Sequence, residues 1–215
     1  MTPFTNTQIA NLRVNRNRPL LVVDADEVIV LFAAHFSKYL NKHGWELNLK
    51  GYRLDDAICR IEDGQIANNK TYVELINDFI KEETRFQPEA PGASNALKIL
   101  SQQWEIIILT NVPTSARQDR IRNLTKLGMN FPVVSNSGLK GEALAKIIRL
   151  SDQKSVFIDD NPFQIESASQ FVPNTLRFHF TACDIVSKTL PFCSSATHRP
   201  KTWSEILAIL STTLG

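Results

Sequence analysis

Five short apolar runs constrain what this chain can fold into. Apolar residues occupy adjacent positions in all of these runs except the last, so both faces of the strands that the first four form must be buried. The runs are LLVVDAD (20–26), EIIILTN (105–111), FPVVSN (131–136), SVFIDDN (155–161) and TLRFHF (175–180). Strands buried on both faces are typical of a parallel sheet that is covered by helices. The pattern predicts a doubly wound α/β core.

Helical patterns separate these runs from the second one onward. The segments 93–103, 114–127 and 139–150 show helical periodicity, and a last helix is expected from Trp203 to about Leu210. The alternation of strands and helices favours right-handed crossover connections and a parallel strand order. We therefore expect helices on both sides of one sheet.

A block without strong strand character separates the first two runs. Two helical stripes lie in it: one around Phe36 and Tyr39 that ends at Gly44, and one from Tyr72 to Ile80. Roughly sixty residues are far too many for a strand-to-helix connection, which usually takes about 2–6 residues. We therefore expect a small, mostly helical cap domain. The predicted division is a tail at 1–18, a core at 19–28 and 89–215, and the cap at 29–88.

The composition limits the classes of partner. The 215 residues include 24 basic and 22 acidic side chains, for a formal net charge of +2, which gives no reason to expect nucleic acid or an anionic membrane. No stretch resembles a secretory signal or a membrane span. Three cysteines without a CxxC pair argue against a disulfide framework and a zinc site. We expect a cytoplasmic protein that binds its partner at a local site.

Polar residues end three of the five predicted strands. They are Asp24 and Asp26, then Thr110 and Asn111, and then Asp159 and Asp160. Ligands of an open parallel sheet bind beyond the carboxyl ends of its strands. Four carboxylates brought together there would raise one another's pKa values and destabilise the fold unless a cation lay among them. Oxygen ligands in a half-open cluster suit Mg²⁺, which also accepts a phosphate oxygen.

Two further features indicate phosphoryl transfer. Lys140 begins a predicted helix, where the helix dipole disfavours a cation by roughly 0.3–1 kcal/mol, so it is expected to reach toward the carboxylates or a bound phosphate. Asp24 and Asp26 are spaced i, i+2, which places both on one side of an extended backbone. One carboxylate can attack phosphorus while the other donates a proton to the leaving group. Taken singly, each feature also fits a turn, a helix cap such as Asn161 before Pro162, or a surface lysine.

The ordered set of these residues resembles the haloacid dehalogenase-like (HAD) hydrolase superfamily over roughly residues 19 to 180. The matching motifs are Asp24-Ala25-Asp26, Thr110 at the end of IIILTN, Lys140 at a helix start, and Asp159-Asp160 at the end of a strand. The resemblance implies a Rossmann-like core and a phosphatase-type member with a cap inserted after the first motif. Such a cap usually goes with small phosphorylated metabolites as substrates.

The resemblance also implies roles for individual residues. Asp24 would be the nucleophile that becomes an aspartyl-phosphate, and Asp26 the general acid and then base. Thr110 and Lys140 would hold the phosphoryl group, with Asn111 beside them as a substrate-lining residue. Mg²⁺ would be bound by Asp24, by the backbone carbonyl of Asp26, and by Asp160 with Asp159 next to it. Taken together, these roles predict a Mg²⁺-dependent phosphoric monoester hydrolase.

Several alternatives stay open at this point. A phosphomutase or phosphotransferase would share the same residues, and a silent member would only bind a ligand. A signalling receiver domain is disfavoured because Lys140 precedes Asp159 and because the insertion has no counterpart in it. Asp26 argues against dehalogenation, since the dehalogenating branch lacks that residue. Glu27-Val28 stands where many members have Gly-Thr, so the turn into the cap is expected to differ.

Overall fold

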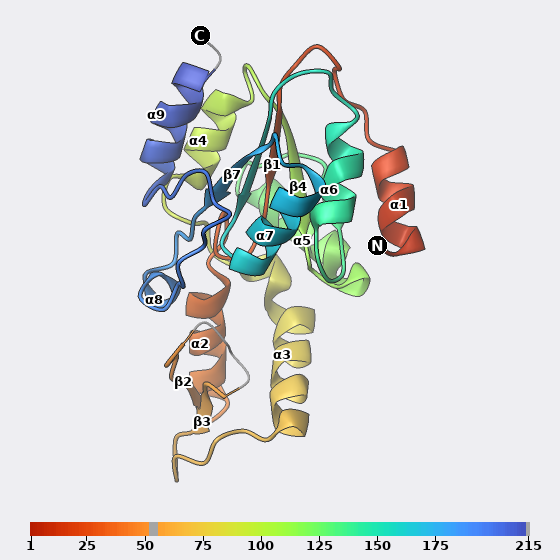
Figure 1. The fold of residues 1–215 in the computed structure, drawn as a ribbon. Coiled ribbons are helices and arrows are strands. Elements are labelled where there is room, and N and C mark those ends of the chain that lie inside the picture. Colours follow the sequence, from red (N-terminus) through yellow and green to blue (C-terminus); the bar gives the residue numbers. More distant parts are fainter. Residues whose placement is uncertain (52–55, 214–215) are drawn as a thin grey trace.

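A five-stranded parallel sheet forms the centre of the computed structural model, which describes residues 1–51 and 56–213 (Figure 1). The strand order is β5-β4-β1-β6-β7, and all neighbouring strands run parallel. The bounds are β1 Leu20–Val23, β4 Glu105–Thr110, β5 Val133–Ser135, β6 Ser155–Asp159 and β7 Leu176–His179. This confirms the predicted doubly wound, Rossmann-like α/β fold, and each predicted strand contains an observed one.

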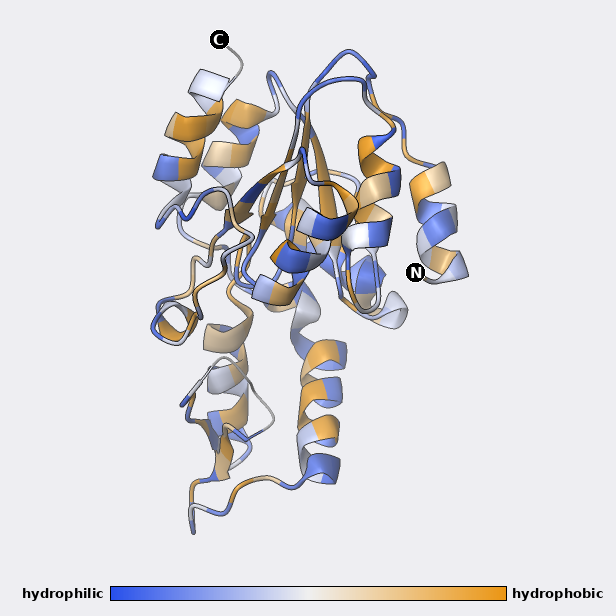
Figure 2. Ribbon diagram, in the orientation of Figure 1, coloured by the Kyte–Doolittle hydropathy of each residue, from blue (hydrophilic) through white to orange (hydrophobic). Residues whose placement is uncertain are grey.

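Helices cover both faces of the sheet, as the apolar runs require. One face packs against α4 (Ala93–Leu100), α5 (Arg117–Lys126) and α9 (Trp203–Thr213). The other face packs against α1 (Pro3–Ala10), α6 (Gly141–Ile148) and α7 (Pro162–Phe171). Figure 2 shows most of the sheet as apolar, between helices that carry both polar and apolar residues. The core therefore lies in two layers, one on each side of the sheet.

The register of the sheet aligns the strand ends that carry the polar residues. In the central strand β1, Val23 pairs with Ile108 of β4 on one side and with Ile158 of β6 on the other. The Asp24 amide continues the ladder by donating to the Ile158 carbonyl at 2.9 Å. The residues that follow these three strands therefore emerge at the same edge of the sheet.

The segment 29–88 lies beyond this edge and has a small apolar cluster of its own (Figure 1). Its elements are α2 (Phe32–Lys42), β2 (Trp45–Leu47), β3 (Ile58–Arg60), α3 (Asn69–Glu83) and the 3-10 helix η1 (Thr84–Phe86). We call this segment the insertion; its residues 52–55 lie outside the described part of the chain. The antiparallel pair β2 and β3 was not expected, because strands of three residues leave no recognisable alternation.

Two chain crossings join the insertion to the core, and they pair with each other. The Leu31 amide donates to the Pro88 carbonyl at 3.0 Å, and the Ala90 amide donates to the Ile29 carbonyl at 3.0 Å. We call this pair of crossings the hinge between insertion and core. The domain boundaries near residues 29 and 88 stay a prediction.

The N-terminal segment differs from the expectation. Residues 1–18 were predicted to be a tail, whereas the structure shows helix α1 packed against α6, with Thr5 and Ile9 buried. Thr2 caps this helix by accepting from the Thr5 amide, and Pro3 occupies its first position. The helix has no clear apolar stripe, which is why periodicity alone missed it.

Two further elements complete the described chain. A 3-10 turn, η2 (Thr114–Ala116), precedes α5, and a short helix, α8 (Asp184–Ser187), follows β7. Asn161 caps α7 by accepting from the Phe163 amide, with Pro162 at the first helical position, as the sequence suggested. None of the described helices combines the length and the apolar character that a membrane span needs.

Candidate active site

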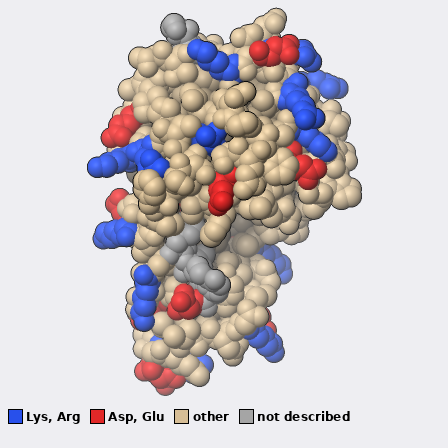
Figure 3. All heavy atoms as spheres, in the orientation of Figure 1, with Lys and Arg blue, Asp and Glu red and all other residues tan. Residues whose placement is uncertain are grey.

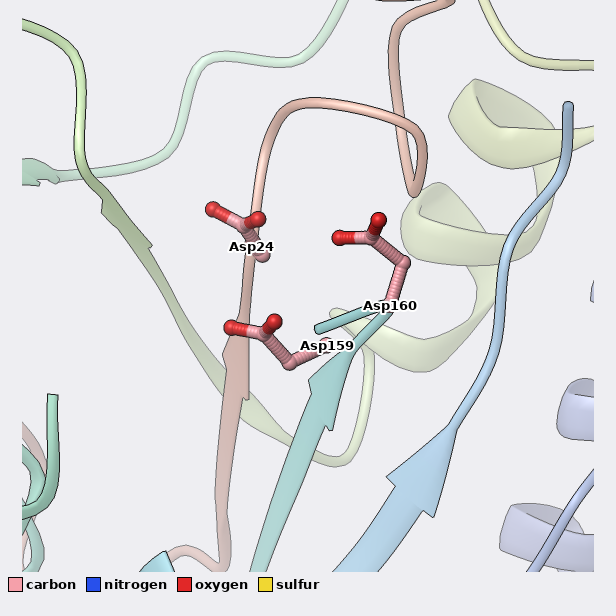
Figure 4. Close-up of side chains that lie close together, drawn as sticks. All are labelled: Asp24, Asp159 and Asp160. Atoms are coloured by element: carbon pink, nitrogen blue, oxygen red, sulfur yellow. The ribbon is translucent and has the colours of Figure 1, made fainter. Parts of the chain in front are cut away.

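Asp24, Asp159 and Asp160 meet beyond the ends of β1 and β6 (Figure 4). One carboxylate oxygen from each lies within 4.8 Å of the others, and all three side chains are buried. Three carboxylates so close together need positive charge among them, and oxygen-only ligands of this kind suit Mg²⁺. The donor set therefore fits the metal that the sequence predicts. Asp160 also borders the open cleft described below, whereas Asp159 is fully enclosed.

Lys140 supplies a positive charge inside this group. Its Nζ lies 2.7 Å from Oδ1 of Asp24 and 2.7 Å from Oδ2 of Asp159. Burial alone would lower the pKa of Lys140, but the charges of Asp159 and Asp24 outweigh burial and raise it. The lysine is therefore charged, and of the two destinations expected for it, the structure shows the carboxylates.

Close packing at the start of α6 fixes Lys140 in place. The Lys140 amide donates to Oε1 of Gln164 in α7 at 2.8 Å. The next residue, Gly141, leaves no room for a side chain, because a Cβ there would lie 2.5 Å from Oγ of Ser167. Glycine lets α6 approach α7 closely, and that approach brings the lysine to the ends of β1 and β6.

Burial dominates the electrostatics of the two carboxylates that Lys140 contacts. Burial raises the pKa of Asp24 to about 7, although Lys140 opposes the rise, and Asp159 and Asp26 add to it. The pKa of Asp159 is also raised by burial, against Lys140 and the Asn161 amide. The single ammonium group of Lys140 therefore does not fully neutralise the charge of the clustered carboxylates. A divalent cation would favour the ionised carboxylates, including an Asp24 that is able to attack.

Thr110 and Asn111 end β4, next to the strand of Asp24. Thr110 is buried, and its hydroxyl accepts from the Val112 amide at 3.4 Å. Asn111 donates to the Gly138 carbonyl at 2.9 Å and accepts from Asn136 at 3.1 Å. These bonds tie the end of β4 to the loop that leads into Lys140. In this structure the amide of Asn111 organises that loop, and its contact with a substrate stays a prediction.

Asp26 lies apart from the three clustered carboxylates. Its Oδ1 is 2.5 Å from Nη2 of Arg120 in α5, and Ala25 between the two acids is buried in the core. The Asp26 side chain therefore has a cation of its own. Arg120 was not predicted from the sequence, although this residue shares the helical stripe of Leu124 and Leu127, where a polar residue is unusual.

Glu27 is the non-glycine residue with a positive φ, 62°, in the part of the chain that the structure describes. Its carboxylate caps α2 by accepting from the Ala33 amide. Burial raises its pKa to about 7, against the Ala33 bond. The sequence flagged this position because many HAD members carry glycine there, and the left-handed backbone explains that preference. A glutamate here joins the hinge to the first helix of the insertion.

A cleft of about 880 Å³ opens between the sheet edge and the insertion. Asp26, Glu27 and Asp160 line its core side. The insertion contributes Phe32, Ala33, Leu49, Asn69 and Tyr72, and the remaining lining residues are Asn161, Phe163, Val186, Thr189 and Pro191. The cleft is thus acidic where it meets the strand ends and largely apolar elsewhere, a form typical of a small-molecule site.

Charges on the outer surface show no comparable concentration. On the face shown in Figure 3, basic and acidic side chains are interspersed over both the core and the insertion. The strong clustering of charge lies inside the molecule, at the strand ends.

Sequence comparisons give no match. No protein-family model matches the chain. No curated protein matches it either. Any relationship must therefore be read from the fold and from the arrangement of the site.

Solved structures with the same fold are numerous, and three are representative. A protein assigned as a HAD-hydrolase from Bacillus subtilis, with magnesium bound, is 14% identical with a TM-score of 0.63, covering 91% of this chain and 99% of that one. A HAD family hydrolase from Deinococcus radiodurans, with phosphate and sodium bound, is 12% identical with a TM-score of 0.59, covering 92% and 97%. A protein assigned as a beta-phosphoglucomutase from Thermotoga maritima is 16% identical with a TM-score of 0.59, covering 90% and 99%.

The likeness extends over nearly the whole of each protein. At these identities it is the fold that is shared. Four of the residues that the sequence matched to the HAD motifs, Asp24, Lys140, Asp159 and Asp160, lie together at the end of the sheet where the ligands of such folds bind. The chain therefore has the fold of the haloacid dehalogenase-like hydrolases and phosphomutases.

Proposed function

We propose that this protein is a Mg²⁺-dependent phosphatase that hydrolyses a small phosphorylated molecule through an aspartyl-phosphate on Asp24. The observation that carries the proposal is the buried group at the strand ends, where Lys140 lies 2.7 Å from both Asp24 and Asp159, with Asp160 alongside. Two of the solved structures with this fold contain magnesium or phosphate, which supports a metal and a phosphorylated ligand here.

Asp24 and Asp160 would hold the metal, together with the backbone carbonyl of Asp26. Asp159 is the less suitable ligand, because its Oδ2 contacts Lys140 and its Oδ1 accepts from the Asn161 amide at 2.9 Å. When bound, Mg²⁺ would neutralise charge on the phosphoryl oxygens. Asp159 then serves chiefly to fix the ammonium group of Lys140.

Asp24 is the nucleophile in the first step. One carboxylate oxygen of Asp24 forms a bond to phosphorus as the bond between phosphorus and the ester oxygen breaks. Asp26 gives a proton to the departing alkoxide. In the second step a water oxygen bonds to phosphorus, Asp26 takes the water proton, and the bond between Asp24 and phosphorus breaks. Lys140 and Thr110 hold the phosphoryl group between these steps, with Asn111 at its border.

The cleft beside the carboxylates would hold the alcohol part of the substrate. Among the residues that the structure describes along its lining there is no lysine or arginine, and the acidic members are Asp26, Glu27 and Asp160. A second anionic group on the substrate would face these acids without a partner. The cleft therefore suits the phosphate ester of an alcohol without a further negative charge, and Phe32 and Tyr72 suit an apolar or aromatic portion.

A phosphomutase or phosphotransferase is the second candidate, because a protein assigned as a beta-phosphoglucomutase shares the fold over 90% of this chain. The two candidates differ in what accepts the phosphoryl group from Asp24. Water gives inorganic phosphate, whereas a substrate hydroxyl gives a new phosphate ester. The cleft beside Asp160 is open to solvent, which supports water as the acceptor and hence hydrolysis.

We also place the protein in the cytoplasm. Its three cysteines, Cys59, Cys183 and Cys193, are free thiols, and Cys183 and Cys193 are buried. Free thiols are usual where the environment is reducing. The cofactor and substrates proposed above are compatible with that compartment.

The proposal is tested by phosphate release from a generic aryl phosphate. The purified protein is assayed with Mg²⁺, with chelator, and with Mg²⁺ restored after chelation. We expect release that stops with chelator and returns with the metal. A transferase would instead yield a phosphorylated acceptor when a polyol is added, with little free phosphate. Neither product, with folded protein and Mg²⁺ present, would contradict both candidates.

A further inference from the structure

We propose that Arg120 is a positioning residue that holds the carboxylate of Asp26 in the orientation needed for proton transfer. The inference rests on the proposed phosphatase function and adds to it a residue outside the HAD motifs that the sequence matched. Arg120 belongs to α5, on one face of the sheet, whereas Lys140 precedes α6 on the other. Each of the two acids of the Asp24-Ala25-Asp26 motif thus has a buried cation from a different helix.

The burial of Arg120 is the first argument. Its side chain is 1% exposed, and its Nη2 lies 2.5 Å from Oδ1 of Asp26. A buried guanidinium needs a carboxylate partner, because an unpaired buried charge is strongly unfavourable. Asp26 is that carboxylate among the described residues, since the other side-chain hydrogen bond of Arg120 is to the amide oxygen of Asn123. The position of Asp26 is therefore coupled to a side chain that has little freedom to move.

The anchoring of Arg120 is the second argument. Its Nη1 donates to Oδ1 of Asn123 at 3.3 Å, and Nδ2 of Asn123 donates to the Gln87 carbonyl at 2.8 Å. Gln87 lies in the crossing by which the chain leaves the insertion. Arg120 is thus held between the motif turn and the hinge. A chain of hydrogen bonds from the hinge to Asp26 fixes where the acid points.

The different roles of the two Asp26 carboxylate oxygens are the third argument. Arg120 binds Oδ1, so Oδ2 is left to carry the transferable proton. The Asp26 side chain is 29% exposed and lines the cleft, where the leaving group of the substrate would lie. Holding one oxygen fixes the direction of the other, and catalysis by proton transfer depends on such geometry. Loss of Arg120 should therefore affect the transfer of the proton more than the binding of phosphate.

The dependence of kcat/KM on the leaving group separates this role from a structural one. The variants are Arg120→Gln and Arg120→Lys, and the matched control is Arg122→Gln on the same helix, where the Arg122 side chain is 63% exposed and pairs with Asp119. Each protein is assayed with 4-nitrophenyl phosphate, whose leaving group needs little protonation, and with an alkyl phosphate, whose alkoxide needs it. The folded state is checked by circular dichroism and thermal unfolding.

For Arg120→Gln we expect kcat/KM for the alkyl phosphate to fall about 10-fold or more, within the range of lost acid catalysis, while the aryl value changes less than about 3-fold. Arg120→Lys should recover part of the alkyl activity, and Arg122→Gln should leave both values unchanged. An equal loss on both substrates, or no loss on either, would overturn the inference while leaving the phosphatase proposal intact. A wild-type protein inactive on every ester would overturn both.

A double variant covers the case in which Arg120→Gln does not fold. Asp26→Asn with Arg120→Gln removes both partners, so no buried charge is left unpaired. If Arg120 acts through Asp26, the alkyl-to-aryl ratio of kcat/KM in the double variant equals that of Asp26→Asn alone. A further decrease of the ratio in the double variant would show that Arg120 acts independently of Asp26, and would contradict the inference.

Discussion

The sheet edge and the insertion face each other across one cleft, yet they are built in different ways. At the sheet edge, Asp24, Lys140 and Asp159 are buried and tied together by contacts of 2.7 Å. The described part of the insertion borders the cleft with Phe32, Ala33, Leu49, Asn69 and Tyr72, none of which is charged. The charged groups that can carry out phosphoryl transfer are thus fixed in the sheet. The side chains that can select a substrate belong largely to the smaller unit.

The difference follows from what each region can support. The sheet has an apolar layer on both faces, and this large core can hold several charged side chains at its edge. The apolar cluster of the insertion is small, with Phe36, Leu40, Ile58 and Phe79 at its centre. A small apolar core offers few places to bury a charged side chain. A unit with few buried apolar contacts also opens more easily. Under the proposed function, the division of chemistry and recognition between the two regions would follow from their sizes.

The largest expected effect is at Asp24. Asp24→Asn removes the nucleophile, and aryl phosphate turnover should fall by roughly 10⁴-fold or more, the scale on which loss of a nucleophile acts. Asp152→Asn, an exposed aspartate paired with Arg16, is the control and should retain full turnover. Turnover of Asp24→Asn within about 10-fold of wild type would place the chemistry elsewhere and break the comparison.

Replacement of Lys140 tests whether the sheet edge depends on paired charge. Lys140→Gln leaves Asp24 and Asp159 buried without their cation, and the free energy of unfolding without metal should fall by about 3–5 kcal/mol. Mg²⁺ should restore part of the loss by binding the folded state. Lys146→Gln, an exposed lysine in the same helix, is the control. Equal stability of the two variants in urea unfolding would contradict the account.

The pH dependence of stability tests the contribution of Glu27, on the hinge side of the cleft. Its pKa rises from an ordinary 4.5 to about 7 on folding, so the unfolded chain loses its proton first as pH increases. Stability is therefore lost between about pH 4.5 and 7, by up to roughly 3 kcal/mol at about 1.4 kcal/mol per pKa unit. Glu27→Gln should remove this loss and be more stable than wild type at pH 8. The exposed Glu166→Gln is the control, and unfolding curves in which Glu27→Gln and wild type keep the same pH dependence would oppose the prediction.

The smallest expected effect is the difference in kcat/KM between substrates of different charge. Two aryl phosphates of equal size, 4-carboxyphenyl phosphate and its neutral 4-carbamoyl analogue, differ in the second negative charge. The acids of the cleft should favour the neutral ester by about 10-fold in kcat/KM, since like charges in an interface are unfavourable. Preference for the carboxylate would show that the cleft provides a cation for it.

Much of this arrangement could be predicted from the sequence, because strands buried on both faces leave a clear pattern. The strand that leads to Asp24 and the one that ends at Asp159 were located from apolar runs alone. The solved structures confirm the HAD-like fold, while the roles of the site residues stay proposals. The residues at strand ends were easy to place, since the register of a parallel sheet brings such ends together.

The features that were not predicted depend on contacts between distant residues, which leave no local pattern in the sequence. Arg120 shares the apolar stripe of α5, but nothing near it in the sequence names its partner, because Asp26 is 94 positions away. Helix α1 was missed because its contacts with α6 come from isolated residues such as Ile9. Tertiary contacts between distant segments made the difference in both cases.

The central claim is that Asp24 becomes phosphorylated, and trapping that state tests it most directly. Asp26→Asn should form the aspartyl-phosphate from an aryl phosphate, whose leaving group needs little protonation, but should hydrolyse it slowly because the base is missing. After acid quenching, we expect the mass of one added phosphoryl group on the peptide that contains Asp24. A phosphoryl group on another residue, or turnover without any phosphorylated protein, would contradict the account.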